Sequence, residues 1–138
     1  MKVIISQFFT LLFLSSFAFA QDANKVQVDV VLKTTKSWTG DLLPAYPKGQ
    51  PEVTILKIVI PPHTKLPVHK HPVMNAGILT KGELVVVTQD NKELHMKAGD
   101  SINEVVHKWH NGENRTDKPA EIIVFYAGIE GKPNTIKK

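Results

Sequence analysis

Three histidines carry the chemistry that this sequence suggests. His69 and His71 are separated by one residue, and His110 follows further along the chain. On an extended strand the side chains alternate between two faces, so residues i and i+2 point the same way. A third histidine on a neighbouring strand could then complete a face of three imidazoles around one metal ion. The chain has only 6 histidines, and this spacing of three of them predicts a metal site.

The type of ligand limits the choice of metal without deciding it. Imidazole nitrogen suits several divalent transition metals, so Fe, Zn, Ni, Cu and Mn all stay open. Three-histidine faces with open positions occur at catalytic zinc and at nonhaem iron, and both ions bind water that a substrate can displace. The simpler alternative is that the three histidines are half-buried polar residues hydrogen-bonded to their neighbours in a metal-free barrel.

The elements that must position these histidines are predicted to be strands. No segment after Gln21 keeps a helical period of 3.6 residues, and apolar runs alternate with turns rich in Gly, Pro and Asn. Such short, evenly spaced strands favour an all-β sandwich or barrel. An immunoglobulin-like sandwich is the plain alternative, but the chain has no cysteine for its disulfide. The predicted strands are Val26–Leu32, Val53–Ile60, Val68–His71, Asn75–Thr80, Glu83–Thr88, Glu93–Lys97, Ser101–Val106, Lys108–Asn111 and Glu121–Ala127.

Two segments resemble the two sequence motifs of the cupin superfamily. His63 to Gly82 has the spacing of the first motif, and Gly99 to Asn114 has the spacing of the second. The resemblance implies a single-domain, cupin-type β-barrel, also described as a double-stranded β-helix or jelly roll. It also implies metal ligands at His69, His71 and His110, with Asn75 at the position of the usual fourth ligand. The other motif positions are occupied by His63, Gly82, Gly99, Val105, His107 and Asn114.

The departures from the cupin motifs bear on the chemistry. Asn75 stands where the family usually has a metal-binding Glu, and an asparagine amide is a neutral, weak ligand. Without that Glu the site keeps the full charge of a dication, which makes it a stronger Lewis acid. We therefore expect a small anionic ligand, such as a carboxylate or an enolate. His63 and His107 replace two turn glycines, and Val105 replaces a proline.

The remaining candidate residues carry less weight. Glu104 could point into the barrel, where it could orient a ligating histidine or accept a proton as a weak catalytic candidate. The simpler expectation is that Glu104 faces solvent. His107 is expected in a tight turn, where histidine tolerates positive φ. His63 is expected in a loop, His95 on an alternating strand, and Trp109 on an outer face.

The sequence predicts four parts along the chain. Residues 1–20 have the basic start, apolar centre and Ala18-Phe19-Ala20 cleavage site of a secretory signal peptide. A membrane anchor is the alternative, but polar residues interrupt the apolar stretch. We expect an N-terminal strand and arm over 21–52, the cupin barrel over 53–130 and a flexible tail over 131–138. The predicted location is therefore periplasmic or extracellular, and the mature chain has no membrane span.

The composition of the chain limits the kinds of molecule that it is expected to bind. Lys and Arg total 17 and Asp and Glu total 13, for a net charge of +4, and the charges are scattered, which speaks against a nucleic-acid surface. A secreted domain without disulfides relies on its core, a metal or an oligomer interface. The family resemblance suggests a homodimer that uses Val26–Leu32 and Trp38–Pro51 as its interface.

Strand alternation also predicts the hydrophobic core. The predicted core residues are Ile78, Leu84, Val86, Ile102, Ile123 and Phe125.

Two functions are compatible with these residues. The first is an exported cupin metalloenzyme that oxygenates, isomerises or decarboxylates a small anionic substrate. The second is a barrel that binds or senses a metal or a small ligand without turnover.

Overall fold

Short apolar runs broken by turns form strands in residues 25–138, the part of the chain that the computed structural model describes. The signal peptide predicted for residues 1–20 lies outside this part. Residues 25–138 contain no helix. The strands are β1 (Pro51–Ile60), β2 (Thr64–Lys65), β3 (His69–Lys70), β4 (Met74–Lys81), β5 (Glu83–Thr88), β6 (Glu93–Lys97), β7 (Ser101–Asn103), β8 (His110–Asn114), β9 (Ala120–Ile129) and β10 (Ile136–Lys137).

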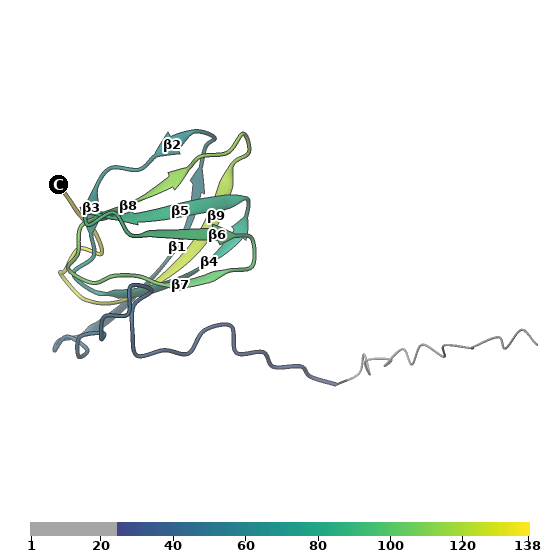
Figure 1. Cartoon of the computed structure of the whole chain (residues 1–138). Coiled ribbons are helices and arrows are strands. Elements are labelled where there is room, and N and C mark those ends of the chain that lie inside the picture. The colour runs from purple at the N-terminus through teal and green to yellow at the C-terminus, as the bar shows by residue number, and fades with distance from the viewer. Residues whose placement is uncertain (1–24) are drawn as a thin grey trace, which may run out of the picture.

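The strands form two sheets that enclose a barrel (Figure 1). One sheet has the order β1-β9-β4-β7, and the other has the order β10-β3-β8-β5-β6 with β2 paired to β8. All pairings between these strands are antiparallel, and β1 pairs with β9 along its whole length. This architecture confirms the predicted all-β, cupin-type fold.

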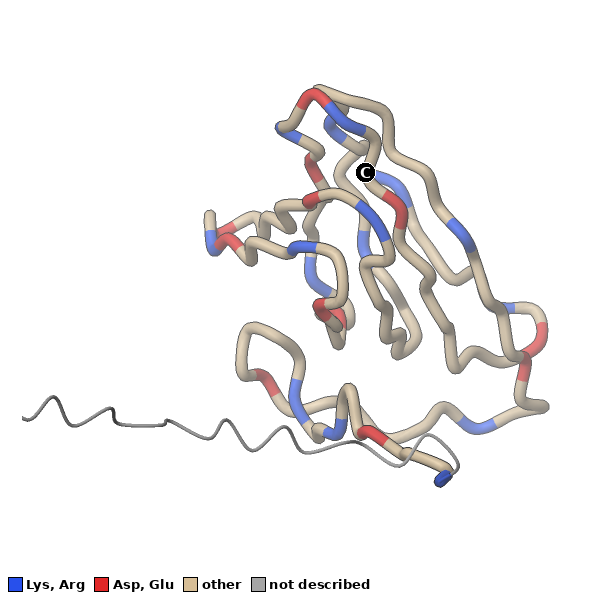
Figure 2. Tube along the Cα trace, turned by 90° about the vertical axis from the view of Figure 1, so that its right-hand side faces the viewer, with Lys and Arg blue, Asp and Glu red and all other residues tan. Residues whose placement is uncertain are grey.

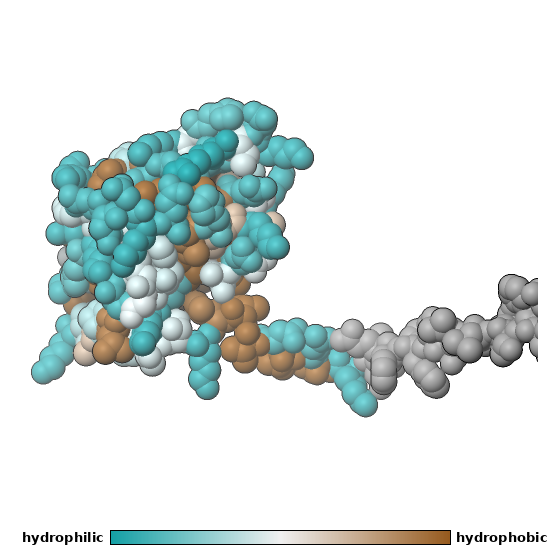
Figure 3. All heavy atoms as spheres, in the orientation of Figure 1, coloured by the Kyte–Doolittle hydropathy of each residue, from teal (hydrophilic) through white to brown (hydrophobic). Residues whose placement is uncertain are grey.

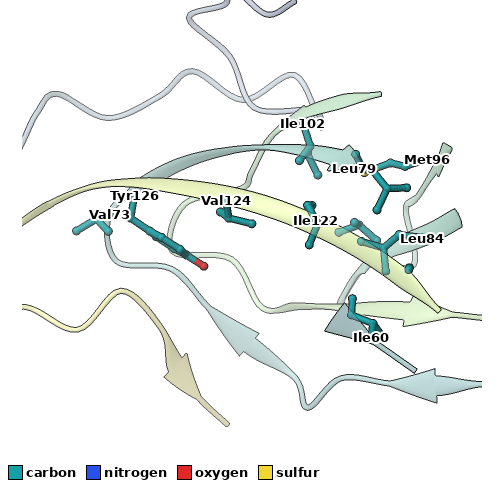
Figure 4. Close-up of a cluster of buried hydrophobic side chains, with 11 residues drawn as sticks. Ile60, Val73, Leu79, Leu84, Met96, Ile102, Ile122, Val124 and Tyr126 are labelled. Atoms are coloured by element: carbon teal, nitrogen blue, oxygen red, sulfur yellow. The ribbon is translucent and has the colours of Figure 1, made fainter. Parts of the chain in front are cut away.

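The hydrophobic core lies between the two sheets. Ile122, Val124 and Tyr126 project from one side of β9 toward the core (Figure 4). Leu84 and Val86 meet them from β5, and the alternation within each strand explains the shared face. The buried apolar cluster comprises Ile60, Val73, Leu79, Leu84, Val86, Met96, Ile102, Ala120, Ile122, Val124 and Tyr126.

Half of the predicted core residues lie on the wrong face. Leu84, Val86 and Ile102 are buried as predicted, but Ile78, Ile123 and Phe125 are exposed. On β4 and β9 the inward positions are the other parity, which places Leu79 and Ile122 in the core. Apolar residues dominate both faces of these strands, so only Thr80 on β4 and Glu121 on β9 mark the outer side in the sequence alternation.

The outward apolar residues form a continuous surface that we call the outer β1–β9–β4 face. Ile55 lies opposite Phe125 in the β1–β9 pair, and Ile78 lies opposite Ile123 in the β4–β9 pair. Lys57 and Glu121 form an ion pair of 3.0 Å on the same side. The exposed apolar side chains of this face are Val53, Ile55, Val59, Ile78, Ile123 and Phe125.

The two ends of the described chain differ from the prediction. Residues 26–32, predicted as a strand, form no strand and extend away from the barrel as an exposed apolar segment (Figures 1 and 3). An alternating pattern becomes a strand only where a sheet edge offers backbone partners. The Ser101 hydroxyl donates to the Val31 carbonyl of this segment at 2.8 Å. The 131–138 tail instead contains β10, which pairs with β3.

The charged residues are interspersed over the surface. Figure 2 shows Lys and Arg alternating with Asp and Glu along the described trace, without a large region of one sign. Within residues 25–138, no helix has the length and apolar content needed to cross a membrane.

Candidate metal centre

Strand register brings the three predicted histidines together. His69 on β3 lies directly opposite His110 at the start of β8, and His71 follows β3 and bridges to Val106. The ring centroids are 4.5 Å apart for His69 and His110, and 5.0 Å apart for each of the other two pairs. One ring nitrogen from each histidine lies within 4.8 Å of the other two, so the three rings converge as the spacing predicted.

The backbone sets the tautomer of each histidine. Nδ1 of His69 contacts the Pro67 carbonyl at 2.8 Å, Nδ1 of His71 contacts the Asn134 carbonyl at 2.8 Å, and Nδ1 of His110 contacts the Lys108 carbonyl at 2.9 Å. A carbonyl oxygen only accepts, so each Nδ1 carries the proton and donates it. The Nε2 lone pair of each ring is therefore available to a metal.

Burial favours the neutral form of two rings. Desolvation, helped by the neighbouring rings of His110 and His69 and opposed by the Asn134 carbonyl, lowers the pKa of His71 to about 3. Desolvation also lowers the pKa of His69. Both imidazoles are consequently neutral near pH 7, which is the protonation state that binds metals.

Of two buried nitrogens at this cluster, His110 Nε2 supports the fit of a metal, whereas Asn75 Nδ2 is an amide donor that does not bind a cation. His110 Nε2 and Asn75 Nδ2 have no hydrogen-bond partner among residues 25–138, although His110 is 2% exposed and Asn75 is 5% exposed. A buried polar atom without a partner costs about 1–3 kcal/mol. A metal bound by the three Nε2 atoms would satisfy the His110 lone pair. The imidazole donor set and its convergence therefore fit a divalent transition metal.

A small cavity adjoins the histidines. Its volume is about 70 Å³. The polar side chains collect beside the three rings, whereas both sheets contribute apolar walls. The cavity is lined by Ile58, Ile60, Leu66, His69, His71, Asn75, Leu84, Val86, Ile102, Glu104, His110, Gly112, Ile122, Val124 and Tyr126.

Glu104 corrects the simpler sequence expectation. It does not face solvent but is 9% exposed and lines the cavity. Its backbone N–H donates to the Asn75 carbonyl at 3.1 Å, which holds it beside β4. Glu104 Oε2 lies 3.8 Å from His110 Nε2. The weak catalytic candidate of the sequence is thus a buried carboxylate next to the histidine cluster.

Two groups that surround the histidine cluster were not predicted from the sequence. Tyr126 on β9 lies beside His71, with ring centroids 5.4 Å apart, and burial raises its pKa. The carbonyl of Asn134, in the segment predicted as a flexible tail, fixes the His71 tautomer. Tyr126 sits in an apolar run that gave no functional signal, and a backbone carbonyl has no sequence signature.

The other histidines lie outside the cluster. His107 has φ 61° in a turn, as expected, and His63 has φ 52° and contacts Asp117 at 2.7 Å. The His95 side chain is exposed and contacts Glu93 at 3.0 Å. Trp109 lies under the Lys70 ammonium, which is 4.7 Å from the ring centroid.

Comparison with known proteins identifies the family. The cupin domain model matches residues 56–126, which is more than half of the chain. Curated protein sequences give no significant match.

Solved structures share the fold at low sequence identity. DMSP lyase DddQ from Ruegeria pomeroyi DSS-3 matches with a TM-score of 0.55 and 16% identity over 62% of this chain and 43% of that chain. Oxalate oxidase in complex with the substrate analogue glycolate matches with a TM-score of 0.52 and 22% identity over 62% of this chain and 45% of that chain. A cupin-like protein (tm1010) from Thermotoga maritima msb8 matches with a TM-score of 0.57 and 17% identity over 62% of this chain and 64% of that chain.

The match therefore spans less than half of the two enzymes, and at these identities it shows the fold alone. The family model, the two-sheet barrel and the histidines at the motif positions agree: this chain belongs to the cupin family.

Proposed function

We propose that this cupin holds one divalent transition metal with His69, His71 and His110 and uses the site to bind a small anion. The observation that carries the proposal is the shared hydrogen-bond pattern of the three rings. Each Nδ1 donates to a backbone carbonyl, so three Nε2 lone pairs converge. Histidines with a purely structural role would need only hydrogen bonds to their neighbours. Such a role does not explain why three free Nε2 lone pairs converge on one point.

The cavity limits the size of the ligand. One water needs about 10–15 Å³ on this measure, so a volume of about 70 Å³ holds about five water-sized groups. A carboxylate of a few carbon atoms fits this space. The apolar walls reduce the amount of water around the site, which strengthens the attraction between a dication and an anion. A metal bound here would supply Lewis-acid polarisation of the ligand and exchangeable coordination positions.

Catalysis is part of the proposal, with a non-catalytic binding barrel as its alternative. The structural neighbours include a DMSP lyase and an oxalate oxidase bound to glycolate, which supports small organic anions as the ligand class. Glu104 and Tyr126 are the protein groups beside the histidines that could accept or hold a proton. Oxygenation, isomerisation and decarboxylation are the reaction types that we propose to test.

Metal analysis and ligand binding test this function. We expect about one divalent metal per chain in purified protein, measured by inductively coupled plasma mass spectrometry. The metal-loaded protein should then bind oxalate, glycolate or malonate more tightly than the neutral diamide oxamide, measured by calorimetry. Turnover of one anion with oxygen uptake or CO₂ release would identify an enzyme, whereas binding without turnover would support the non-catalytic alternative. Protein that takes up no metal would refute the proposal.

We also propose that two copies associate through the outer β1–β9–β4 face. Ile55 is 64% exposed and Phe125 is 43% exposed on a sheet surface with few charges. Monomeric proteins rarely expose a large contiguous apolar patch, and a two-fold axis lets the same patch cover itself. The face is a stronger candidate than the 26–32 segment and the Trp38–Pro51 arm that the sequence suggested, because its side chains are already held in one rigid sheet.

Replacing Ile55 with Lys should convert a dimer into a monomer, because a buried unpaired ammonium at the interface carries a large desolvation cost. Sedimentation velocity measures the change. Leu42→Lys is the matched control, since Leu42 is 74% exposed in the arm. Dissociation by L42K but not by I55K would assign the contact to the arm, and a wild-type monomer at all concentrations would refute the dimer.

A further inference from the structure

Asn75 on β4 occupies the position where cupins usually have a metal-binding Glu. The carboxylate of Glu104 lies directly beside Asn75. The β4–β7 pairing places Ala76 opposite Asn103, and Glu104 N–H donates to the Asn75 carbonyl at 3.1 Å. Asn75 and Glu104 are therefore cross-strand neighbours, and both side chains line the same cavity. Neighbouring residues on one face of a sheet can exchange roles because their side chains reach the same space.

One oxygen of Glu104 is restrained and the other is directed to the histidines. Oε1 accepts hydrogen bonds from Trp38 Nε1 at 3.0 Å and from the Val105 backbone N–H at 3.1 Å. Oε2 lies 3.8 Å from His110 Nε2. Two atoms that bind one metal at about 2.1 Å each cannot be more than about 4.2 Å apart. The separation between Oε2 and His110 Nε2 is within that limit. Glu104 is not among the side chains whose ligand atoms all lie within 4.8 Å of one another, so its carboxylate must move toward His69 and His71 to share their ion.

In the described part of the chain, no lysine or arginine forms an ion pair with Glu104. Among residues 25–138, its one ion-pair contact is with His110 Nε2, at a distance longer than a hydrogen bond. His110 donates from Nδ1 to a carbonyl, so its Nε2 is a lone pair in the neutral ring. A buried carboxylate without a cationic partner is strongly unfavourable. A dication held by the three Nε2 atoms would supply the missing positive charge.

We propose that Glu104 is the carboxylate ligand of the metal centre, in place of the residue at position 75, and that Trp38 holds it in position. This inference rests on the proposed metal site. It moves the anionic ligand from β4 to the residue that follows β7, and it makes the N-terminal arm part of the support of the centre. The occupied site then carries one unit of positive charge, which still favours an anionic substrate.

The test compares metal affinity in two variants, of which Glu104→Gln is isosteric with the native residue. Glu104→Gln keeps an oxygen that accepts from Trp38 and Val105 but loses the charge, so we expect its Kd for Zn²⁺ and Co²⁺ to rise about 100-fold, as loss of a ligand or its close support does. Trp38→Phe keeps the carboxylate and loses one hydrogen bond, so its Kd should rise less than tenfold. Chelator competition measures Kd, and the visible spectrum of bound Co²⁺ should change in E104Q but not in W38F.

The surface carboxylate Glu113 provides the matched control. It pairs with Lys65 at 2.8 Å and Arg115 at 2.8 Å and does not line the cavity, so Glu113→Gln should leave Kd unchanged. The double variant N75E/E104Q should regain affinity, because it returns a carboxylate to the adjacent position.

The outcomes separate this inference from the proposed function. Wild-type protein that binds no metal would refute the metal site itself. Tight binding in wild type with equal Kd in folded E104Q would leave the histidine site intact and reject Glu104 as a ligand. A folded N75E/E104Q variant that binds no better than E104Q would show that the site does not depend on a carboxylate at this corner.

Discussion

Replacing His69 and His71 together with alanine should abolish stoichiometric metal binding. Only one of the three converging Nε2 lone pairs then remains, so we expect the Kd for Zn²⁺ to rise by far more than 100-fold. The stabilisation by metal should disappear with it. A ligand at 100 times its Kd stabilises the native state by about 2.7 kcal/mol, which corresponds to roughly 10 °C in Tm for a domain of this size. Thermal unfolding with and without Zn²⁺ measures the loss.

The control removes the same number of histidines elsewhere. His63 and His95 have exposed side chains that contact Asp117 and Glu93, away from the cluster. The variant H63A/H95A should bind one metal and keep the full rise in Tm. Equal metal content in H69A/H71A and wild type would contradict the site, because no other cluster of three metal-binding side chains occurs within residues 25–138.

Asn114→Ala should produce the largest loss of stability among single substitutions of polar residues in this barrel. Asn114 is 1% exposed, and its amide nitrogen lies 3.0 Å from the Ile60 carbonyl and 2.7 Å from the Lys118 carbonyl. Its amide oxygen accepts from the Thr116 N–H at 3.0 Å. Each buried group left without a partner costs about 1–3 kcal/mol, so we expect a total loss of about 3 kcal/mol. The Tm should fall by roughly 10–20 °C.

Urea unfolding in the presence of a chelator isolates this effect from metal binding. Asn111→Ala is the matched control on the same strand, since Asn111 is also buried but its amide donates to one partner, Glu113. Its expected loss is about 1 kcal/mol. Equal losses in the two variants would show that the hydrogen bonds of Asn114 do not hold the β8–β9 turn to the end of β1.

The metal cluster was predictable because its signal is local. His69 and His71 share a face through the period of two, and the spacing to His110 matches the second motif of the cupin resemblance. The positive φ of His107 was equally local, since a turn position demands it. The all-β fold followed from alternation and turn residues that leave no helical segment.

Each error arises from a weak polar pattern or from a partner that the sequence does not identify. Ile123 and Phe125 lie in a run with apolar residues on both faces, so parity alone could not place them inside or outside. The 26–32 segment has the alternation of a strand, but alternation does not provide the neighbouring edge that a strand needs. Only the sheet pairing shows that 136–137 supplies such an edge to β3.

Sequence alone determined which residues can bind a metal. It also placed His69 and His71 on one face, because side chains on a strand alternate with a period of two. The tertiary structure decided what surrounds them. It placed Glu104 beside Asn75, brought Trp38 onto Glu104 from a distant part of the chain and set the Asn134 carbonyl against His71. Those contacts depend on strand register and on long-range pairing, which a linear pattern does not encode because each side chain meets its partner only after the sheets have closed.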